Sequence, residues 1–133
     1  MSGDMNQQVN SQAGEPRRLA GRRVLIVEDD FFIAMDMADL LRSHGAEVLG
    51  PLGRVNQAVQ FVTENAGSFD AVLLDMNLHG LKTYPVADVL IRQGVTFVFT
   101  TGYSVDAVEM AYRDHPRCEK PVNSKALLQA LAG

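Results

Sequence analysis

Short apolar runs alternate with amphipathic segments along most of this chain. One run covers 24–27, and others lie at 46–52, 70–75, 95–102 and 117–119. Apolar runs of this length, rich in β-branched residues, are typical of strands that are buried on both faces of a sheet. The pattern therefore predicts five strands.

Between these runs, apolar residues recur at helical spacing. The predicted helices span 29–45, 53–67, 83–94, 104–115 and 123–133. In the first of them Ile33, Met37 and Leu41 share one face, and Asp30 and Gly45 are candidates for its N-terminal and C-terminal caps. The helix at 104–115 has the weakest apolar stripe, so we expect it to be short or mobile.

Strand and helix alternate five times, which predicts an α/β domain with a parallel, doubly wound sheet and helices on both of its faces. The domain covers 21–133. Residues 1–20 are polar and lack periodicity, so we predict a disordered N-terminal tail.

Composition narrows the possible partners. The net charge of −4 argues against nucleic acid or an anionic membrane as the main partner. The single cysteine, Cys118, excludes an internal disulfide and a cysteine-based zinc site. Because the chain has neither a membrane-spanning apolar stretch nor the apolar region of a secretory signal, we expect a soluble, cytoplasmic protein.

The candidate chemistry lies at the ends of the predicted strands. The polar residues there include Glu28, Asp29, Asp75, Thr101 and Lys120. The carboxyl ends of parallel strands meet at one edge of a sheet, so these side chains are expected to lie together. Clustered carboxylates repel one another unless a cation intervenes, and Mg²⁺ suits such oxygen ligands. Together with a lysine and a hydroxyl, they would form a site for a phosphoryl group.

Taken singly, each of these residues has an ordinary explanation. Glu28 and Asp29 also suit the start of a helix, and Asp75 alone would be a strand-end cap. Thr100 competes with Thr101 for the role of the site hydroxyl. Outside this set, the aromatic pair at 31–32 and the two methionines at 35 and 37 are expected to pack in the core or on a helix face.

Four motifs resemble the receiver domain of two-component response regulators. They are "VLIVEDD", "DAVLLDMN", "FVFTTG" and "EKP", in this order over residues 21–131. The loop "TTGY" resembles the Phe-x-Thr-Gly-Tyr-like loop of single-domain receivers, a register that favours Thr101 over Thr100. The resemblance implies a flavodoxin-like (βα)5 fold with strand order 2-1-3-4-5.

The resemblance also implies a role for each site residue. Asp75 would accept the phosphoryl group, and Thr101 and Lys120 would contact it. Mg²⁺ would be held by Glu28, Asp29, Asp75 and the backbone carbonyl of Asn77, with Asp29 a more direct ligand than Glu28. The peptide bond between Lys120 and Pro121 would be cis.

The implied function is that of a stand-alone response regulator. It would take a phosphoryl group from a sensor histidine kinase or a histidine phosphotransfer protein, then signal to an unknown downstream protein or act as a phosphate sink. Catalysis would be limited to self-catalysed phosphotransfer and slow autodephosphorylation. A receiver-like interaction module that never needs phosphate is the alternative. An aspartate-nucleophile phosphatase is disfavoured, because Asn77 stands where such enzymes place a second acid.

Two positions bear on how such a signal would be read. Many receivers carry an aromatic residue three positions before the lysine, and this chain has Arg117 there. Tyr103 is a candidate to take over part of that role, to shield the acyl phosphate from water, or simply to pack on the surface.

Overall fold

Five parallel strands form the central sheet of the computed structural model, which describes residues 18–102 and 112–132. The strands are β1 (Arg23–Val27), β2 (Glu47–Leu52), β3 (Ala71–Asp75), β6 (Thr96–Thr101) and β7 (Arg117–Glu119). Their order across the sheet is β2-β1-β3-β6-β7. Counted along the sheet's own strands this is 2-1-3-4-5, so the predicted doubly wound α/β fold is confirmed.

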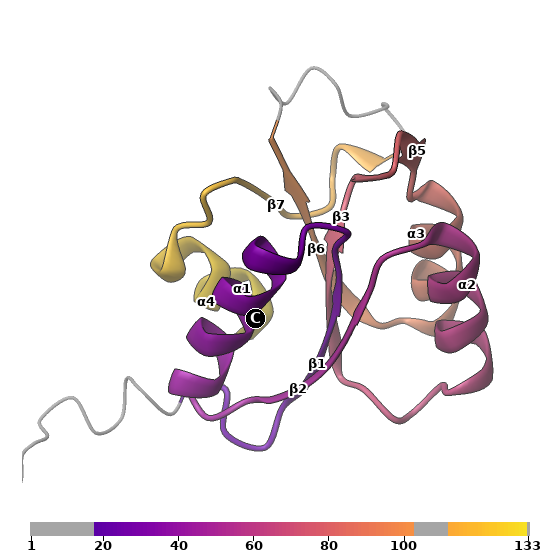
Figure 1. The fold of residues 1–133 in the computed structure, drawn as a ribbon. Coiled ribbons are helices and arrows are strands. Elements are labelled where there is room, and N and C mark those ends of the chain that lie inside the picture. The colour runs from indigo at the N-terminus through magenta and orange to yellow at the C-terminus, as the bar shows by residue number, and fades with distance from the viewer. Residues whose placement is uncertain (1–17, 103–111, 133) are drawn as a thin grey trace, which may run out of the picture.

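Helices cover both faces of the sheet, as Figure 1 shows with the sheet seen nearly edge-on. One face carries α1 (Phe31–Ser43) and α4 (Ser124–Ala132), and the other carries α2 (Val55–Glu64) and α3 (Tyr84–Gln93). Most of the predicted helix at 104–115 lies outside the described residues. No helix within 18–102 and 112–132 combines the length and the apolar character that crossing a membrane requires.

The alternation of side chains along each strand builds two separate cores. In β1, Leu25 and Val27 pack with α2 and α3, whereas Val24 and Ile26 pack with α1 and α4. All four side chains are buried, as expected for a sheet that is covered on both faces. The double burial explains why the strands appear in the sequence as continuous apolar runs.

The ends of α1 are formed by the predicted cap residues. The Asp30 side chain accepts hydrogen bonds from the backbone N–H groups of Phe32 and Ile33, so it is the N-cap. Gly45 follows the helix with φ +94°, and its N–H donates to the carbonyl of Arg42. A positive φ favours glycine, so Gly45 allows the chain to turn sharply into β2.

The folded domain begins closer to the N-terminus than the predicted boundary between residues 20 and 21. Leu19 is fully buried, and its N–H donates to the carbonyl of His44 at 2.9 Å. It packs into the core on the α1 side of the sheet. The ordered domain therefore includes residues 18–20, and residues 1–17 lie outside the described part of the chain.

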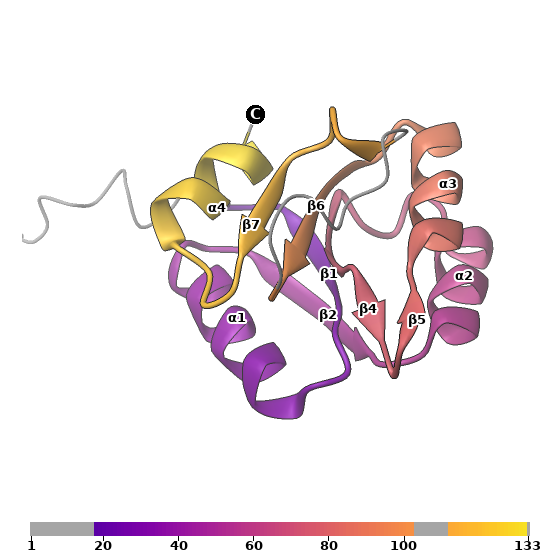
Figure 2. The ribbon, with the colours of Figure 1, turned by 90° about the horizontal axis from the view of Figure 1, so that it is seen from above.

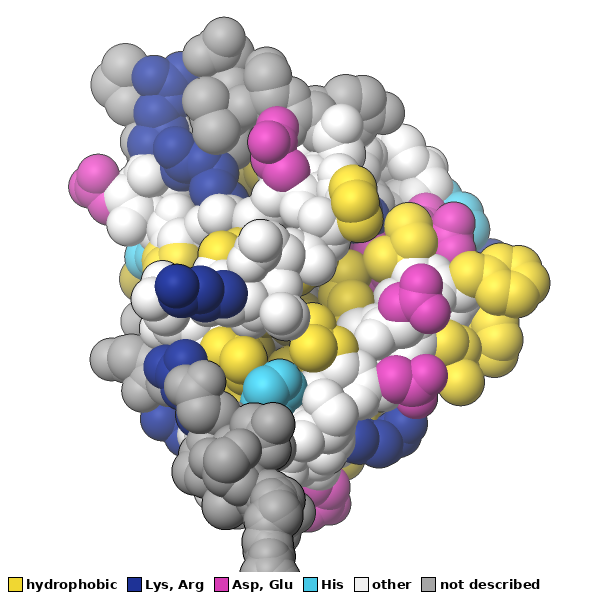
Figure 3. Space-filling model, turned by 90° about the vertical axis from the view of Figure 1, so that its left-hand side faces the viewer, with side chains coloured by type: hydrophobic (Ala, Val, Ile, Leu, Met, Phe, Trp, Pro, Cys, Tyr) yellow, Lys and Arg dark blue, Asp and Glu magenta, His cyan; other side chains and the backbone are white. Residues whose placement is uncertain are grey.

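The expected packing of the aromatic pair at the start of α1 was wrong. Phe31 is 63% exposed, Phe32 is 79% exposed and Met35 is 40% exposed, while Met37 is buried. Figure 3 shows hydrophobic side chains, with acidic groups among them, at one side of this face of the molecule. The helical stripe that begins at Ile33 reaches the core, and these three exposed residues lie off that stripe.

A small β-hairpin between β3 and α3 was not predicted. It consists of β4 (Asn77–Leu78) and β5 (Leu81–Lys82), and in Figure 2 it lies beside α3. His79 and Gly80 form its turn with φ values of 50° and 84°. Two successive positive φ values are those of a type I′ turn, whose usual Asn-Gly or Asp-Gly signature is absent here.

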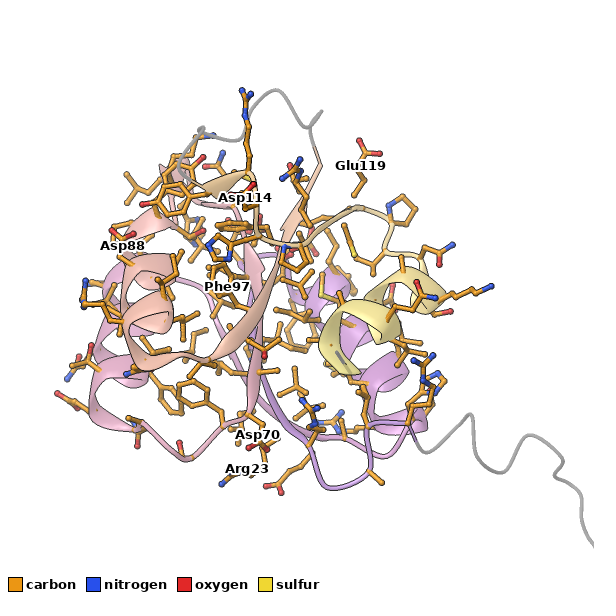
Figure 4. All side chains as sticks on the ribbon, turned by 180° about the vertical axis from the view of Figure 1, so that it is seen from behind. Arg23, Asp70, Asp88, Phe97, Asp114 and Glu119 are labelled. Carbon is orange, nitrogen blue, oxygen red and sulfur yellow. The ribbon has the colours of Figure 1, made fainter. Side chains whose placement is uncertain are left out.

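The end of the sheet away from these loops is tied by one ion pair. Arg23 Nη2 lies 3.0 Å from Asp70 Oδ1, and the backbone N–H of Arg23 donates to Asp70 Oδ2 at 2.8 Å (Figure 4). The Arg23 side chain and then its backbone N–H lower the pKa of Asp70 to about 2. The pair thus joins the starts of β1 and β3.

We expect Asp70→Asn to reduce the free energy of unfolding by about 1 kcal/mol near neutral pH, a figure discounted because the carboxylate is one-third exposed. Because the pKa of Asp70 is lower in the folded than in the unfolded protein, its ionised carboxylate stabilises the folded state fully at pH values above the unfolded-state pKa of about 4. This contribution disappears as the pH falls towards the folded-state pKa of about 2. Urea unfolding at about pH 5 and about pH 2.5 should show the difference between the two proteins shrinking in acid. An equal difference at both pH values would contradict this assignment.

Candidate functional site

The polar residues predicted at the strand ends meet at one edge of the sheet. In the parallel ladders Val27 is opposite Leu74, Asp75 is opposite Thr100, and Thr101 is opposite Glu119. This register aligns the residues that follow β1 and β7 with the ends of β3 and β6. A pocket of about 470 Å³ opens there, lined by residues that include Glu28, Asp29, Asp75, Thr101 and Lys120.

Lys120 bridges two of the carboxylates. Its Nζ lies 2.8 Å from Glu28 Oε1 and 2.8 Å from Asp75 Oδ2. The other oxygen of Asp75 accepts a hydrogen bond from the backbone N–H of Asn77 at 3.1 Å, and Glu28 Oε2 accepts one from the N–H of Asp30 at 3.0 Å. Both acids are therefore held in place by groups on neighbouring loops.

The pKa values of Glu28 and Lys120 are both raised, for different reasons. The Glu28 side chain is 1% exposed, and loss of solvation raises its pKa to about 7 although Lys120 acts in the opposite direction. At Lys120, burial alone would lower the pKa, but hydrogen bonds to Asp75 and Glu28 outweigh it and the pKa is raised. Lys120 therefore remains an ammonium at neutral pH, while Glu28 needs more positive charge nearby to ionise fully.

Asp29 is oriented by the hairpin. Its Oδ2 accepts a hydrogen bond from the backbone N–H of His79 at 2.8 Å, across 50 positions of sequence. Burial acts to raise the pKa of Asp29, but this bond and the neighbouring groups outweigh it and lower the pKa. Asp29 is thus an ionised carboxylate that points towards the hairpin side of the pocket.

The donor set fits a hard divalent cation. Carboxylate oxygens of Glu28, Asp29 and Asp75 lie within 4.8 Å of one another. With one ammonium against three carboxylates, the cluster has a formal charge of −2 when all three acids are ionised. The side-chain oxygen of Asn77 is buried without a hydrogen-bond partner among the described residues. Such a set of oxygens is typical of Mg²⁺ ligands, and the charge is the one that Mg²⁺ would neutralise.

The structure distinguishes the two neighbouring threonines. Thr101 is 2% exposed, lines the pocket, and accepts a hydrogen bond at its carbonyl from the N–H of Lys120 at 2.8 Å. Thr100 is not one of the described residues that line the pocket, and its hydroxyl is buried. Successive residues of a strand project to opposite faces, and of these two side chains it is that of Thr101 that lines the pocket.

Two of the site's contacts were not predicted. The hydroxyl of Thr83, just before α3, donates to the carbonyl oxygen of Asp75 at 2.6 Å and so anchors that helix to the end of β3. The other is the bond from the backbone N–H of His79 to Asp29, which joins two loops far apart in the sequence. The glycine at position 80 was the one local signal of a tight turn here.

Solved structures share this fold and arrangement of strands, although no family model matches the chain. SdrG from Sphingomonas melonis Fr1 is 38% identical, with a TM-score of 0.74 over 84% of this chain and 93% of that chain. The REC domain of the response regulator PhyR from Erythrobacter litoralis is 27% identical, with a TM-score of 0.71 over 86% of this chain and 89% of that chain. This chain belongs to the response regulator receiver domains.

Further relatives of this receiver domain are consistent with that assignment. A second SdrG structure, a BeF3-activated conformation, is 38% identical and has a TM-score of 0.70 over 85% of this chain and 95% of that chain. The transcriptional regulatory protein PdtaR of Mycobacterium tuberculosis is 39% identical over 57 residues. That match covers 43% of this chain and only 27% of PdtaR.

Three of the details that the resemblance raised concern the peptide bond at Pro121 and the residues at positions 117 and 103. The Lys120–Pro121 peptide bond is cis, as the resemblance implied. Arg117, in the place of the usual aromatic residue, donates from Nη1 to the carbonyl of Arg113 at 2.8 Å. Tyr103 lies outside the described residues, so its expected roles stay predictions.

Proposed function

We propose that this receiver domain accepts a phosphoryl group on Asp75 in a Mg²⁺-dependent reaction. The observation that carries the proposal is the position of the Asp75 carboxylate, 2.8 Å from the Lys120 ammonium and clustered with two more acids at an open pocket. The donor would be a phosphohistidine on a sensor histidine kinase or a histidine phosphotransfer protein. The BeF3-activated conformation of SdrG, a 38% identical relative, supports a phosphoryl-type ligand in this family.

In the proposed transfer, an Asp75 carboxylate oxygen attacks the donor's phosphorus. An O–P bond forms, the P–N bond to the donor's imidazole breaks, and its electron pair leaves with that nitrogen. Lys120 would move its ammonium onto a phosphoryl oxygen, and the Thr101 hydroxyl would donate to another. Bound Mg²⁺, held by Glu28, Asp29, Asp75 and Asn77, would supply charge neutralisation.

The output we propose is a protein contact or the drainage of phosphate from a shared kinase. The domain would act in the cytoplasm as a phosphoacceptor with slow loss of the phosphoryl group, and not as a turnover enzyme. The net charge of −4 supports a protein partner over a nucleic acid.

The test is labelling of the full chain by acetyl phosphate, followed by intact-protein mass spectrometry. We expect addition of one phosphoryl group with MgCl2 and none when EDTA replaces it, because the three carboxylates repel an anionic donor without a cation. Treatment with hydroxylamine should remove the label, as it does from an acyl phosphate. Failure of the protein to take up label with MgCl2 would favour the interaction module that needs no phosphate.

A further inference from the structure

The β4–β5 hairpin brings a second lysine to the pocket. Lys82, on β5, is directly opposite Asn77 in the antiparallel pair and lines the pocket together with it. Residues directly opposite each other in such a pair project from the same side of the ribbon. The hairpin's position is set from within the site, since His79 binds Asp29 and the N–H of Thr83 donates to the carbonyl of Met76 at 3.1 Å.

The two lysines that line the pocket differ in whether their ammonium groups form ion pairs. Lys120 has 17% of its side chain exposed and is engaged by Glu28 and Asp75 at 2.8 Å each. Lys82 is exposed, and within the described residues it has neither an ion pair nor a side-chain hydrogen bond. Among those residues, its ammonium is therefore unpaired at a pocket in which Glu28 and Asp75 are buried.

The unpaired Lys82 ammonium matters because the phosphoryl donor that the pocket would bind is itself an anion. The pocket is lined by four acids, Glu28, Asp29, Asp30 and Asp75, and the whole chain carries a net charge of −4. With Lys120, these four acids have a formal charge of −3, of which a bound Mg²⁺ would neutralise two, so an approaching phosphoryl donor still meets net negative charge. A cation at the rim of a cleft raises the local concentration of anions and their association rate.

We infer that Lys82 is a positioning residue that attracts the phosphoryl group of the donor into the pocket. This inference rests on the proposed function, and it goes further by giving the hairpin a role in the rate of donor capture. Lys82 makes no bond to the reacting atoms. Its contribution is electrostatic, so it should depend on the charge of the donor and on salt.

The experiment compares Lys82→Gln with Lys125→Gln in the full chain. The sequence has three lysines, and Lys125 is exposed on α4 and is not one of the described residues that line the pocket. Both substitutions change the net charge equally, so they differ only in position. At low ionic strength we expect Lys82→Gln to slow labelling by acetyl phosphate roughly three- to tenfold, with Lys125→Gln close to the unchanged protein.

Three further measurements separate steering from a structural effect. The loss in Lys82→Gln should shrink at about 0.5 M salt. It should also be smaller with phosphoramidate, which carries less negative charge than acetyl phosphate near neutral pH. Lys82→Arg should restore the rate. Equal rates for Lys82→Gln and Lys125→Gln, or a loss that ignores both salt and donor charge, would overturn the inference. Failure of the unchanged protein to take up label would instead overturn the proposed function, and this inference with it.

Discussion

Replacing Asp75 with asparagine is expected to abolish phosphoryl labelling, with a residual rate at least about 100-fold lower than that of the unchanged protein. Asparagine matches the volume of aspartate, but its neutral amide is not a nucleophile. It also removes the negative charge that faces Lys120 at 2.8 Å. Labelling by acetyl phosphate with MgCl2, measured by intact mass, checks this result.

A matched control exists on α1. Asp39 is exposed there, and Asp39→Asn makes the same chemical change away from the pocket, so its labelling should equal that of the unchanged protein. Retention of the label by Asp75→Asn would mean that another carboxylate accepts the phosphoryl group. Peptide mapping of the labelled variant would then locate it among the acids of the pocket.

The second large effect is expected on stability. Lys120→Met keeps the length of the side chain but removes the ammonium between two carboxylates that are 1% and 6% exposed. Removal of one partner from a buried ion pair leaves uncompensated charge, so we expect the metal-free protein to lose about 3 kcal/mol of unfolding free energy. Urea unfolding at slightly alkaline pH in EDTA measures this loss.

The control for this substitution is Lys125→Met on the exposed side of α4, which should change stability little. MgCl2 should restore part of the stability of Lys120→Met, since a cation that binds only the folded state stabilises it by mass action. A Lys120→Met protein as stable in EDTA as the Lys125→Met control would show that the acids do not need this lysine.

Much of the fold could be read from the order of the side chains. Strands buried on both faces must be continuous apolar runs, so β1, β3 and β6 were visible without any long-range information. The caps of α1 were visible for a similar reason, because Asp30 and Gly45 act through bonds to residues within one helical turn. The choice of Thr101 over Thr100 needed the resemblance, and Thr101 is the one of the two that lines the pocket.

Exposure at the start of α1 could not be read in this way. Phe31 and Phe32 have the composition of core residues, but burial depends on whether another element lies above them. The same limit applied to Leu19, which is apolar in a polar tail and becomes buried only because His44 and the α1 side of the sheet lie against it. Composition predicts which residues can be buried, and packing decides which of them are.

The order of residues along the chain was enough to predict the parallel α/β sheet and the carboxylates, hydroxyl and lysine at its strand ends, because periodicity and strand-end position are local properties of the sequence. How these groups are connected could be seen only in the folded domain. Residues on different loops are joined by the bridge from Lys120 to Glu28 and Asp75. The bond from His79 to Asp29 also joins two loops. Lys82 reaches the pocket through the hairpin. Such contacts depend on strand register and hairpin geometry, and those are fixed by the packing of elements far apart in the sequence.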